Sequence, residues 1–265
     1  MTFTYYHLTN ILALAGILIA ILLFLIFHSY PLLIGSLIII FFLRQTLYIY
    51  SMFSARSNFF FKTVKGREFF NNQKGPHAAR ARCGILFRFD DGPHPIYTPQ
   101  ILDILKSEGI QALFAVTGKS AEMYPEIVQR MHRENHIIAN HTYSHPLNIL
   151  FLNYNRIREE ITRTSVIIKN ITGAQPIYFC PPIGHKNQII GKVIKDLGLI
   201  PVMWDIRTWD THASYEKIMA VIKKKIKSPA IIMFHDSIIH SKNDREPTVR
   251  ALKETIRILK EQHYL

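Results

Sequence analysis

The chain of 265 residues is long enough for one domain of ordinary size with an appendage. Hydrophobic residues make up 48% of the chain and its formal net charge is +13, but the apolar excess lies near the N-terminus and the positive charge follows it. The basic residues are dispersed and form no recognised nucleic-acid-binding motif, which argues against a nucleic-acid partner. The two cysteines, Cys83 and Cys180, form no Cys-x-x-Cys motif and exclude a disulfide framework.

Two apolar stretches open the chain. Residues 8–27 contain no charged residue and, at ~1.5 Å per helical residue, would span the roughly 30 Å hydrocarbon core of a bilayer. No Lys or Arg precedes Arg44 and no small-residue cleavage site is evident, so we expect a retained transmembrane helix rather than a signal peptide. Residues 28–31 predict a turn. We expect residues 32–50 to cross the membrane again, with a re-entrant or interfacial helix as the alternative.

Two crossings would return the chain to the side of the membrane on which it started. The basic residues that follow, among them Arg56 and Lys62, predict by the positive-inside rule that this side is the cytoplasm. The expected location is therefore the bacterial cytoplasmic membrane with the remaining domain in the cytoplasm, and the periplasmic or extracellular face is the alternative. The predicted organisation is a membrane segment (1–53), a basic connector (54–83) and one domain (84–265).

Short apolar runs alternate with helical patterns through that domain. We expect strands at residues 85–89, 112–116, 137–140, 177–180, 200–204 and 230–234, and helices at 99–107, 125–133, 155–170, 188–196, 215–226 and 248–261. This strict alternation predicts an α/β fold with a parallel sheet, either an open doubly wound sheet or a closed barrel. In both folds the reactive residues follow the strand ends.

Polar residues stand at those predicted strand ends. Asp90 and Asp91 close the first strand, and two adjacent carboxylates in a dry site need a counter-charge such as a divalent cation. His141 and His145 follow the third strand and, four residues apart on a helical turn, could bind one metal. One carboxylate and two imidazoles leave positions open for water and substrate, as a catalytic metal requires. His235, at the end of the sixth strand, could give a proton to a leaving amine.

Five motifs occur in strand order, over residues 89–93 (Phe-Asp-Asp-Gly-Pro), 141–145 (His-Thr-Tyr-Ser-His), 179–185, 204–211 and 233–236. In this combination the chain resembles the polysaccharide deacetylase family, the NodB-like carbohydrate esterases of family 4, over about residues 84–265. The resemblance implies a deformed (β/α) barrel, here preceded by one or two transmembrane helices. It also implies a catalytic domain that hydrolyses N-acyl groups on amino sugars.

The resemblance assigns roles to individual residues. Asp91, His141 and His145 look like the ligands of a divalent metal, with Zn²⁺ favoured and Co²⁺, Ni²⁺ or Mn²⁺ as alternatives. Asp90 looks like the general base that activates water. His235 looks like the general acid.

Two further positions match the family and one departs from it. Asp210 matches the acidic residue of the fourth motif, and the backbone N–H of Ile183 corresponds to the oxyanion donor. Cys180 stands where the family usually has an arginine that steadies the base. Arg88 lies two residues before Asp90 and so on the same face of a strand. We hypothesise that Arg88 supplies the missing positive charge.

The predicted function is metal-dependent hydrolysis of an N-acetyl or N-formyl group from an amino sugar, in a glycan or a lipid-linked saccharide at the membrane. A polymeric glycan outside the cytoplasmic membrane is the second substrate class and requires the opposite topology. The alternative function is that of a catalytically impaired, membrane-anchored glycan-binding or scaffold protein, because Cys180 removes a charge from the expected site. The sequence does not define the oligomeric state.

Overall fold

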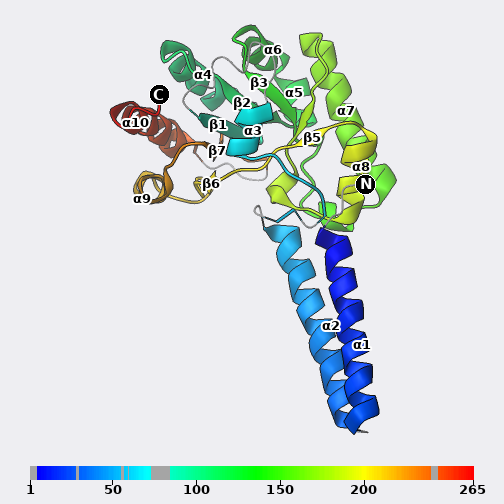
Figure 1. Cartoon of the computed structure of the whole chain (residues 1–265). Helices are drawn as coiled ribbons and strands as arrows, with labels where there is room; N and C mark the ends of the chain where they lie inside the picture. Colours follow the sequence, from blue (N-terminus) through cyan, green and yellow to red (C-terminus); the bar gives the residue numbers. More distant parts are fainter. Residues whose placement is uncertain (1–4, 28–29, 55–56, 59, 73–83, 240–243) are drawn as a thin grey trace.

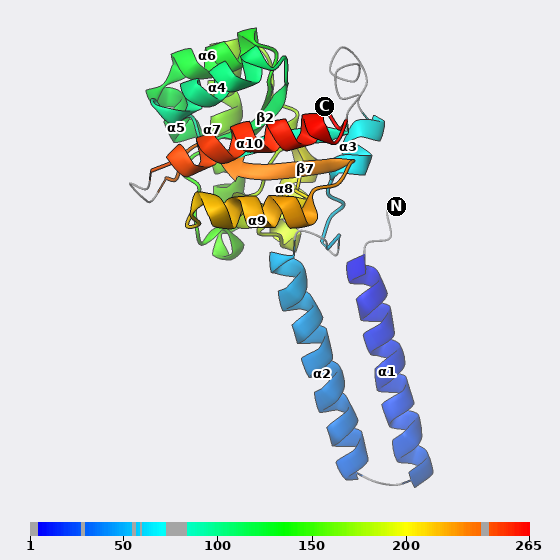
Figure 2. The same cartoon turned by 90° about the vertical axis from the view of Figure 1, so that its left-hand side faces the viewer.

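The computed structural model describes residues 5–27, 30–54, 57–58, 60–72, 84–239 and 244–265. Two helices, α1 (Tyr5–Phe27) and α2 (Tyr30–Phe53), run antiparallel and project away from the rest of the chain (Figure 1, Figure 2). A Cβ atom added to Gly16 would lie 3.2 Å from Ile40 Cδ1, so the glycine allows the two helices to approach closely.

One of these helices has the length and composition of a membrane span. Within the described residues, α2 is apolar and long enough, with a mean hydropathy of 2.0 over its most apolar window, whereas the described apolar part of α1, Asn10–Leu25, is shorter. The predicted second span, residues 32–50, lies inside α2. The predicted turn at residues 28–31 falls partly outside the described residues, and Tyr30 already belongs to α2.

A seven-stranded parallel sheet forms the centre of the remaining chain, in the order β5-β4-β3-β2-β1-β7-β6. Its strands are β1 (Ile85–Asp90), β2 (Ala112–Val116), β3 (Ile137–Asn140), β4 (Tyr178–Phe179), β5 (Ile200–Pro201), β6 (Ile206–Arg207) and β7 (Ala230–His235). The α/β class is confirmed, and the fold is a deformed parallel half-barrel.

The strand predicted at residues 200–204 is confirmed only at its start, where β5 covers Ile200–Pro201, and a further strand, β6, follows at Ile206–Arg207. The chain forms β5 and β6 at opposite edges of the sheet, with no helix between them. Val64, from the predicted connector, lies beside β5, where its N–H donates to Pro201 O at 2.8 Å and its carbonyl accepts from Met203 N at 2.9 Å. Asp205 Oδ2 accepts from Gly66 N and Ile231 N, both at 2.9 Å, and so holds the chain at the turn into β6.

Helices cover the sheet and connect its strands (Figure 1). They are α4 (Tyr97–Ser107), α5 (Gly118–Met123), α6 (Pro125–Arg133), α7 (Tyr154–Thr172), α8 (Gln188–Asp196), α9 (Tyr215–Lys225) and α10 (Glu246–Glu261), with 3₁₀ turns at Ile149–Phe151 and Pro182–Gly184. The sequence did not predict α5, nor α3 (Gly66–Asn72) within the connector. Residues 73–83, the last part of that connector, lie outside the described residues.

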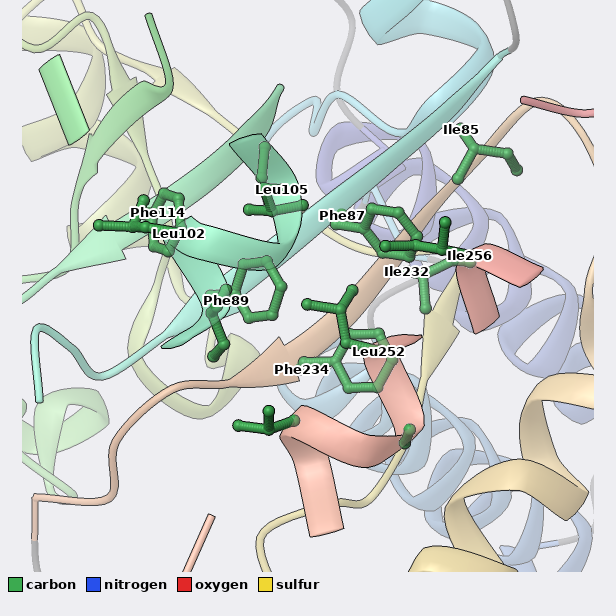
Figure 3. Close-up of a cluster of buried hydrophobic side chains, with 14 of the residues drawn as sticks. Ile85, Phe87, Phe89, Leu102, Leu105, Phe114, Ile232, Phe234, Leu252 and Ile256 are labelled. Atoms are coloured by element: carbon green, nitrogen blue, oxygen red, sulfur yellow. The ribbon is translucent and has the colours of Figure 1, made fainter. Parts of the chain in front are cut away.

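The two faces of β1 have different surroundings. Phe87 and Phe89 point to one side and pack with Phe234 of β7 and Leu252 of α10 in the main hydrophobic core (Figure 3). Burying each of these phenylalanines contributes on the order of 1.5–3 kcal/mol. Alternate residues of a strand face opposite sides, so Arg88 points to the other face, into the interior of the half-barrel.

Candidate active site

The residues predicted to react lie together at the carboxyl ends of the strands. Asp90 ends β1 and is paired in register with His235, which ends β7. A pocket of about 260 Å³ opens there, and its lining includes Asp90, Asp91, His141, His145, Ile183, Trp204, Arg207 and His235. The expectation that the reactive side chains follow the strand ends is therefore met.

Asp91, His141 and His145 form a buried cluster whose candidate ligand atoms all lie within 4.8 Å of one another. Asp91 Oδ1 lies 3.3 Å from His141 Nε2 and 3.4 Å from His145 Nε2. Asp91 Oδ1 and His141 Nε2 are buried and have no hydrogen-bond partner among the described residues. Converging buried polar atoms of this kind need a further partner, and the donor set of one carboxylate and two imidazoles fits a divalent cation.

The ionisation of this cluster also suits a cation. Burial alone would raise the pKa of Asp91, but its contact with His141 and the charges of His145 and His235 outweigh burial and lower that pKa. Burial lowers the pKa of His145 to about 4, although Asp91 opposes the shift, so its imidazole is neutral at neutral pH. His141 Nδ1 lies 2.6 Å from the carbonyl oxygen of Cys180. Since a carbonyl only accepts, Nδ1 carries the proton and Nε2 offers a lone pair to a metal.

The two histidines do not lie on a helical turn, contrary to the sequence prediction. They lie in a loop after β3 in which Thr142 and His145 have positive φ angles of 65° and 51°. Glu160 of α7 holds this loop, accepting from Tyr143 N at 2.9 Å and from Ser144 N and Ser144 Oγ at 2.8 Å each. Contacts with the next α-helix along the chain therefore hold the loop in this conformation.

Arg88 forms a bidentate ion pair with Asp90. Its side chain is 0% exposed, and Nε and Nη2 each donate to one carboxylate oxygen of Asp90 at 2.6 Å. Nη1 donates to Val202 O at 2.9 Å. Burial opposes the charge on Arg88, but Asp90 outweighs it and raises the pKa of the guanidinium. The structure thus places a positively charged guanidinium from β1 beside the carboxylate of Asp90.

Cys180 contributes no such charge. Its thiol is buried, and burial raises its pKa to about 12 although Arg88 opposes the shift. The side chain is part of the apolar cluster inside the half-barrel, together with Leu113 and Met233. Cys180 therefore acts in the site through its carbonyl, which orients His141, rather than through its sulfur.

His235 is held by Asp210. His235 Nδ1 lies 2.8 Å from Asp210 Oδ1, and the backbone N–H of His235 donates to Asp210 Oδ2 at 2.7 Å. Thr208 and Thr248 each donate to this carboxylate at 3.0 Å. Burial lowers the pKa of His235, but Asp210 outweighs it through its charge and hydrogen bond and raises the pKa to about 9. His235 is therefore protonated at neutral pH.

Ile183 and two tryptophans complete the surroundings of the pocket. Ile183 lines the pocket with φ 57° and ψ 2°, a left-handed conformation that is strained for a β-branched residue. Trp204 is 8% exposed and lines the pocket, whereas Trp209 is 53% exposed. Arg207, between the two tryptophans in the sequence, was not among the predicted site residues. Its position next to a strand end and between two tryptophans was the available signal.

Comparison with known proteins agrees with this site. Residues 79–202 match the polysaccharide deacetylase family. A peptidoglycan-N-acetylglucosamine deacetylase from Bacillus cereus is 38% identical over 131 residues, which are 49% of this chain and 46% of that protein. A second one from the same organism is 33% identical over 184 residues, covering 68% of this chain and 83% of that protein. The chain thus spans about half the length of the first relative and most of the second.

Solved structures show the same fold. One is a peptidoglycan N-acetylglucosamine deacetylase in complex with a substituted benzamide, 30% identical with a TM-score of 0.64, covering 69% of this chain and 85% of that one. Another is a pseudoenzyme of carbohydrate esterase family 4 from Bacillus anthracis, 26% identical with a TM-score of 0.61, covering 67% of this chain and 60% of that one. Fold, metal cluster and sequence similarity agree: the chain belongs to the polysaccharide deacetylase family.

Proposed function

We propose that this chain is a divalent-metal-dependent hydrolase that removes an N-acyl group, acetyl or formyl, from an amino sugar. The observation that carries the proposal is the cluster of Asp91, His141 and His145, which shares one pocket with Asp90 and His235. Hydrolysis of an unactivated amide needs an activated water, a base and an acid close together, and this pocket can provide all three.

The cluster would hold the cation through Asp91 Oδ1 and the imidazoles of His141 and His145. Zn²⁺ suits this donor set, and Co²⁺, Ni²⁺ and Mn²⁺ are the alternatives. When bound, the ion would polarise the acyl oxygen and lower the pKa of a water molecule.

The remaining residues move protons and stabilise charge. Asp90, oriented by Arg88, accepts a proton as the water oxygen bonds to the acyl carbon. His235, protonated and oriented by Asp210, donates its proton to the amine nitrogen as the carbon–nitrogen bond breaks. The backbone N–H of Ile183, on the pocket wall, is our candidate donor to the oxyanion. The products are a free amino sugar and a carboxylic acid.

The direct test is release of acetate or formate from a panel of N-acylated polymeric and lipid-linked sugars. The wild-type chain should release the acid, and Asp91→Ala should abolish the release because one metal ligand is lost. Asp103→Ala is the matched control, since the Asp103 side chain is 69% exposed on α4 and pairs with Arg130. Equal release by the wild type and Asp91→Ala would contradict the mechanism.

A non-catalytic glycan-binding protein is the second candidate. Cys180 at the position of the usual arginine favours it, and one similar solved structure is a pseudoenzyme. The Arg88–Asp90 ion pair counts against it, because the base still has a guanidinium partner. Bound metal without turnover of any N-acylated sugar would select this candidate.

We infer that the apolar hairpin anchors the domain to a membrane, so that the substrate is a nearby glycan such as peptidoglycan or a lipid-linked saccharide. The cytoplasmic placement predicted from the basic residues gains no support from the relatives, which are named for peptidoglycan, a polymer outside the cytoplasmic membrane. A reporter that is active only in the cytoplasm, fused after Phe70, decides between the two faces: activity places the domain inside, and silence places it outside.

A further inference from the structure

Arg207 places a guanidinium on the wall of the active-site pocket, whereas Arg88, which holds Asp90, is fully buried. The residue belongs to β6, pairs in register with Met233 of β7, and lines the pocket. Its guanidinium carbon lies 4.0 Å from the ring centre of Trp209 and 5.7 Å from that of Trp204. Two indole rings therefore fix the position of the cation beside the candidate metal ligands.

Arg207 forms no ion pair with any described residue, although all 19 Asp and Glu side chains belong to the described part of the chain. The acidic residues nearest in the site are committed elsewhere, since Asp90 pairs with Arg88 and Asp210 with His235. Asp205, two residues away, accepts from the backbone of Gly66 and Ile231.

The guanidinium is also partly removed from water. Its Nε is buried and has no hydrogen-bond partner among the described residues. A buried N–H of a charged group is unfavourable when it has no acceptor, so this N–H calls for an acceptor from outside the chain. Arg88, which is fully buried on β1, shows the contrast, since each of its three nitrogens donates to a named acceptor.

We propose that Arg207 binds an anionic substituent of the amino-sugar substrate, a phosphate or a carboxylate, and so selects charged over neutral sugars. The inference rests on the proposed function and names the substrate class of the same site. The planar guanidinium matches two oxygens of either anion, and its partial burial strengthens the contact relative to one in water. The apolar hairpin makes the phosphate of a lipid-linked saccharide one source, and the carboxylate of a muramic acid unit is the other.

The test is equilibrium binding, which needs no turnover. The probes are three free amines that correspond to possible products: glucosamine 1-phosphate, muramic acid and methyl glucosaminide. Each is titrated into the full-length, zinc-loaded chain in detergent. Wild type should bind one of the two anionic probes more tightly than the neutral one. Arg207→Met should lower the affinity for that probe by about 10- to 100-fold and leave the affinity for methyl glucosaminide unchanged.

Two further variants separate charge from structure. Arg207→Lys should recover part of the affinity, because it keeps the charge and loses the planar fork. Arg250→Met is the matched control. The guanidinium carbon of Arg250, on α10, lies 4.5 Å from the ring centre of Tyr215 on α9, outside the pocket, and its loss should change no affinity.

Each outcome decides the inference. If Arg207→Met selectively loses affinity for glucosamine 1-phosphate, the lipid-linked source is supported. If it selectively loses affinity for muramic acid, the carboxylate source is supported. Equal affinity of wild type for charged and neutral probes, or an equal loss of all three in Arg207→Met, would overturn the role of Arg207 while leaving the deacetylase proposal standing. If wild type bound none of the probes and also released no acid from the substrate panel, the proposed function itself would fail.

Discussion

A buried guanidinium is stable only when acceptors surround it, and Arg88 meets that condition with Asp90 and the Val202 carbonyl. The charge that the family resemblance placed after β4 is thus supplied from β1, where the strand alternation sets both Arg88 and Asp90 into the interior. Cys180 is buried in the apolar cluster inside the half-barrel, with its thiol neutral. We propose that Arg88 acts through Asp90, as a positioning residue.

Removing Arg88 should impair catalysis rather than metal binding. Arg88→Ala should lower kcat by roughly 10- to 100-fold, because hydrogen bonds to a charged group contribute about 1.5–3 kcal/mol. Arg88→Ala/Cys180→Arg should recover part of the rate by returning a guanidinium from the end of β4. Steady-state kinetics and zinc affinity are measured together, and an unchanged kcat in Arg88→Ala would refute the assignment.

The state of His235 predicts the pH dependence. Its pKa of about 9 means that the proton is present below that pH and lost above it, so kcat/KM should fall on the alkaline side near pH 9. Asp210→Asn removes the charge that raises this pKa, and the alkaline limb should move to lower pH. A pH–rate profile of both proteins checks this, and identical alkaline limbs would show that Asp210 does not tune the acid.

Loops at the ends of elements set the geometry of the metal cluster. The loop after β3 contains Thr142 and His145 with positive φ angles and is tied to α7 by three hydrogen bonds to Glu160. The position of His145 thus depends on a contact with the next α-helix along the chain. Residues that orient metal ligands commonly change affinity when removed, even without touching the ion.

Glu160→Ala should weaken zinc binding by about 10- to 100-fold while the fold is preserved. The matched control is Glu159→Ala, because Glu159 directly precedes Glu160 on α7 and, among the described residues, pairs only with the exposed Arg156. Metal competition titrations give both affinities. If Glu160→Ala bound zinc as tightly as the wild type, the loop would keep its conformation without this carboxylate.

The sequence predicted elements well where burial alone determines them. β2 and β3 match the predicted bounds because strands buried in a parallel sheet are continuous apolar runs. The predicted strand 200–204 ends early because the chain turns at Asp205, whose N–H donates to Ile231 O and whose carboxylate accepts from the backbone N–H groups of Gly66 and Ile231. The left-handed residues of the histidine loop and the pairing of Arg88 likewise depend on contacts that no local pattern contains.

At the scale of the whole molecule, the domain is joined to the end of α2 through Lys186. Lys186 is 1% exposed, its Nζ donates to Ser54 O at 2.6 Å and also to Ser57 O, and its N–H donates to Met52 O at 3.0 Å. Phe53 packs edge-on against His185 with ring centres 5.1 Å apart. These contacts join the chain next to Ile183, on the pocket wall, to the end of α2.

Lys186→Met should loosen this junction without removing the metal site. Carbonyls that lose a charged donor are left unsatisfied, which costs about 1–3 kcal/mol, so proteolysis near Ser54–Ser57 should become faster while zinc affinity stays the same. Lys192→Met is the control, because the Lys192 side chain is 66% exposed and pairs with Asp196 on α8. Equal proteolysis of the two variants would contradict a fastening role for Lys186.

The central claim is that one divalent ion at Asp91, His141 and His145 supports N-deacylation, and a metal titration tests it most directly. Metal-free full-length chain is titrated with Zn²⁺, and bound ion and released acetate are measured in the same samples. We predict that both rise together and saturate at about one ion per chain, and that His141→Ala shows neither tight binding nor release. Acetate release that persists without bound metal, or that is unchanged in His141→Ala, would contradict the account.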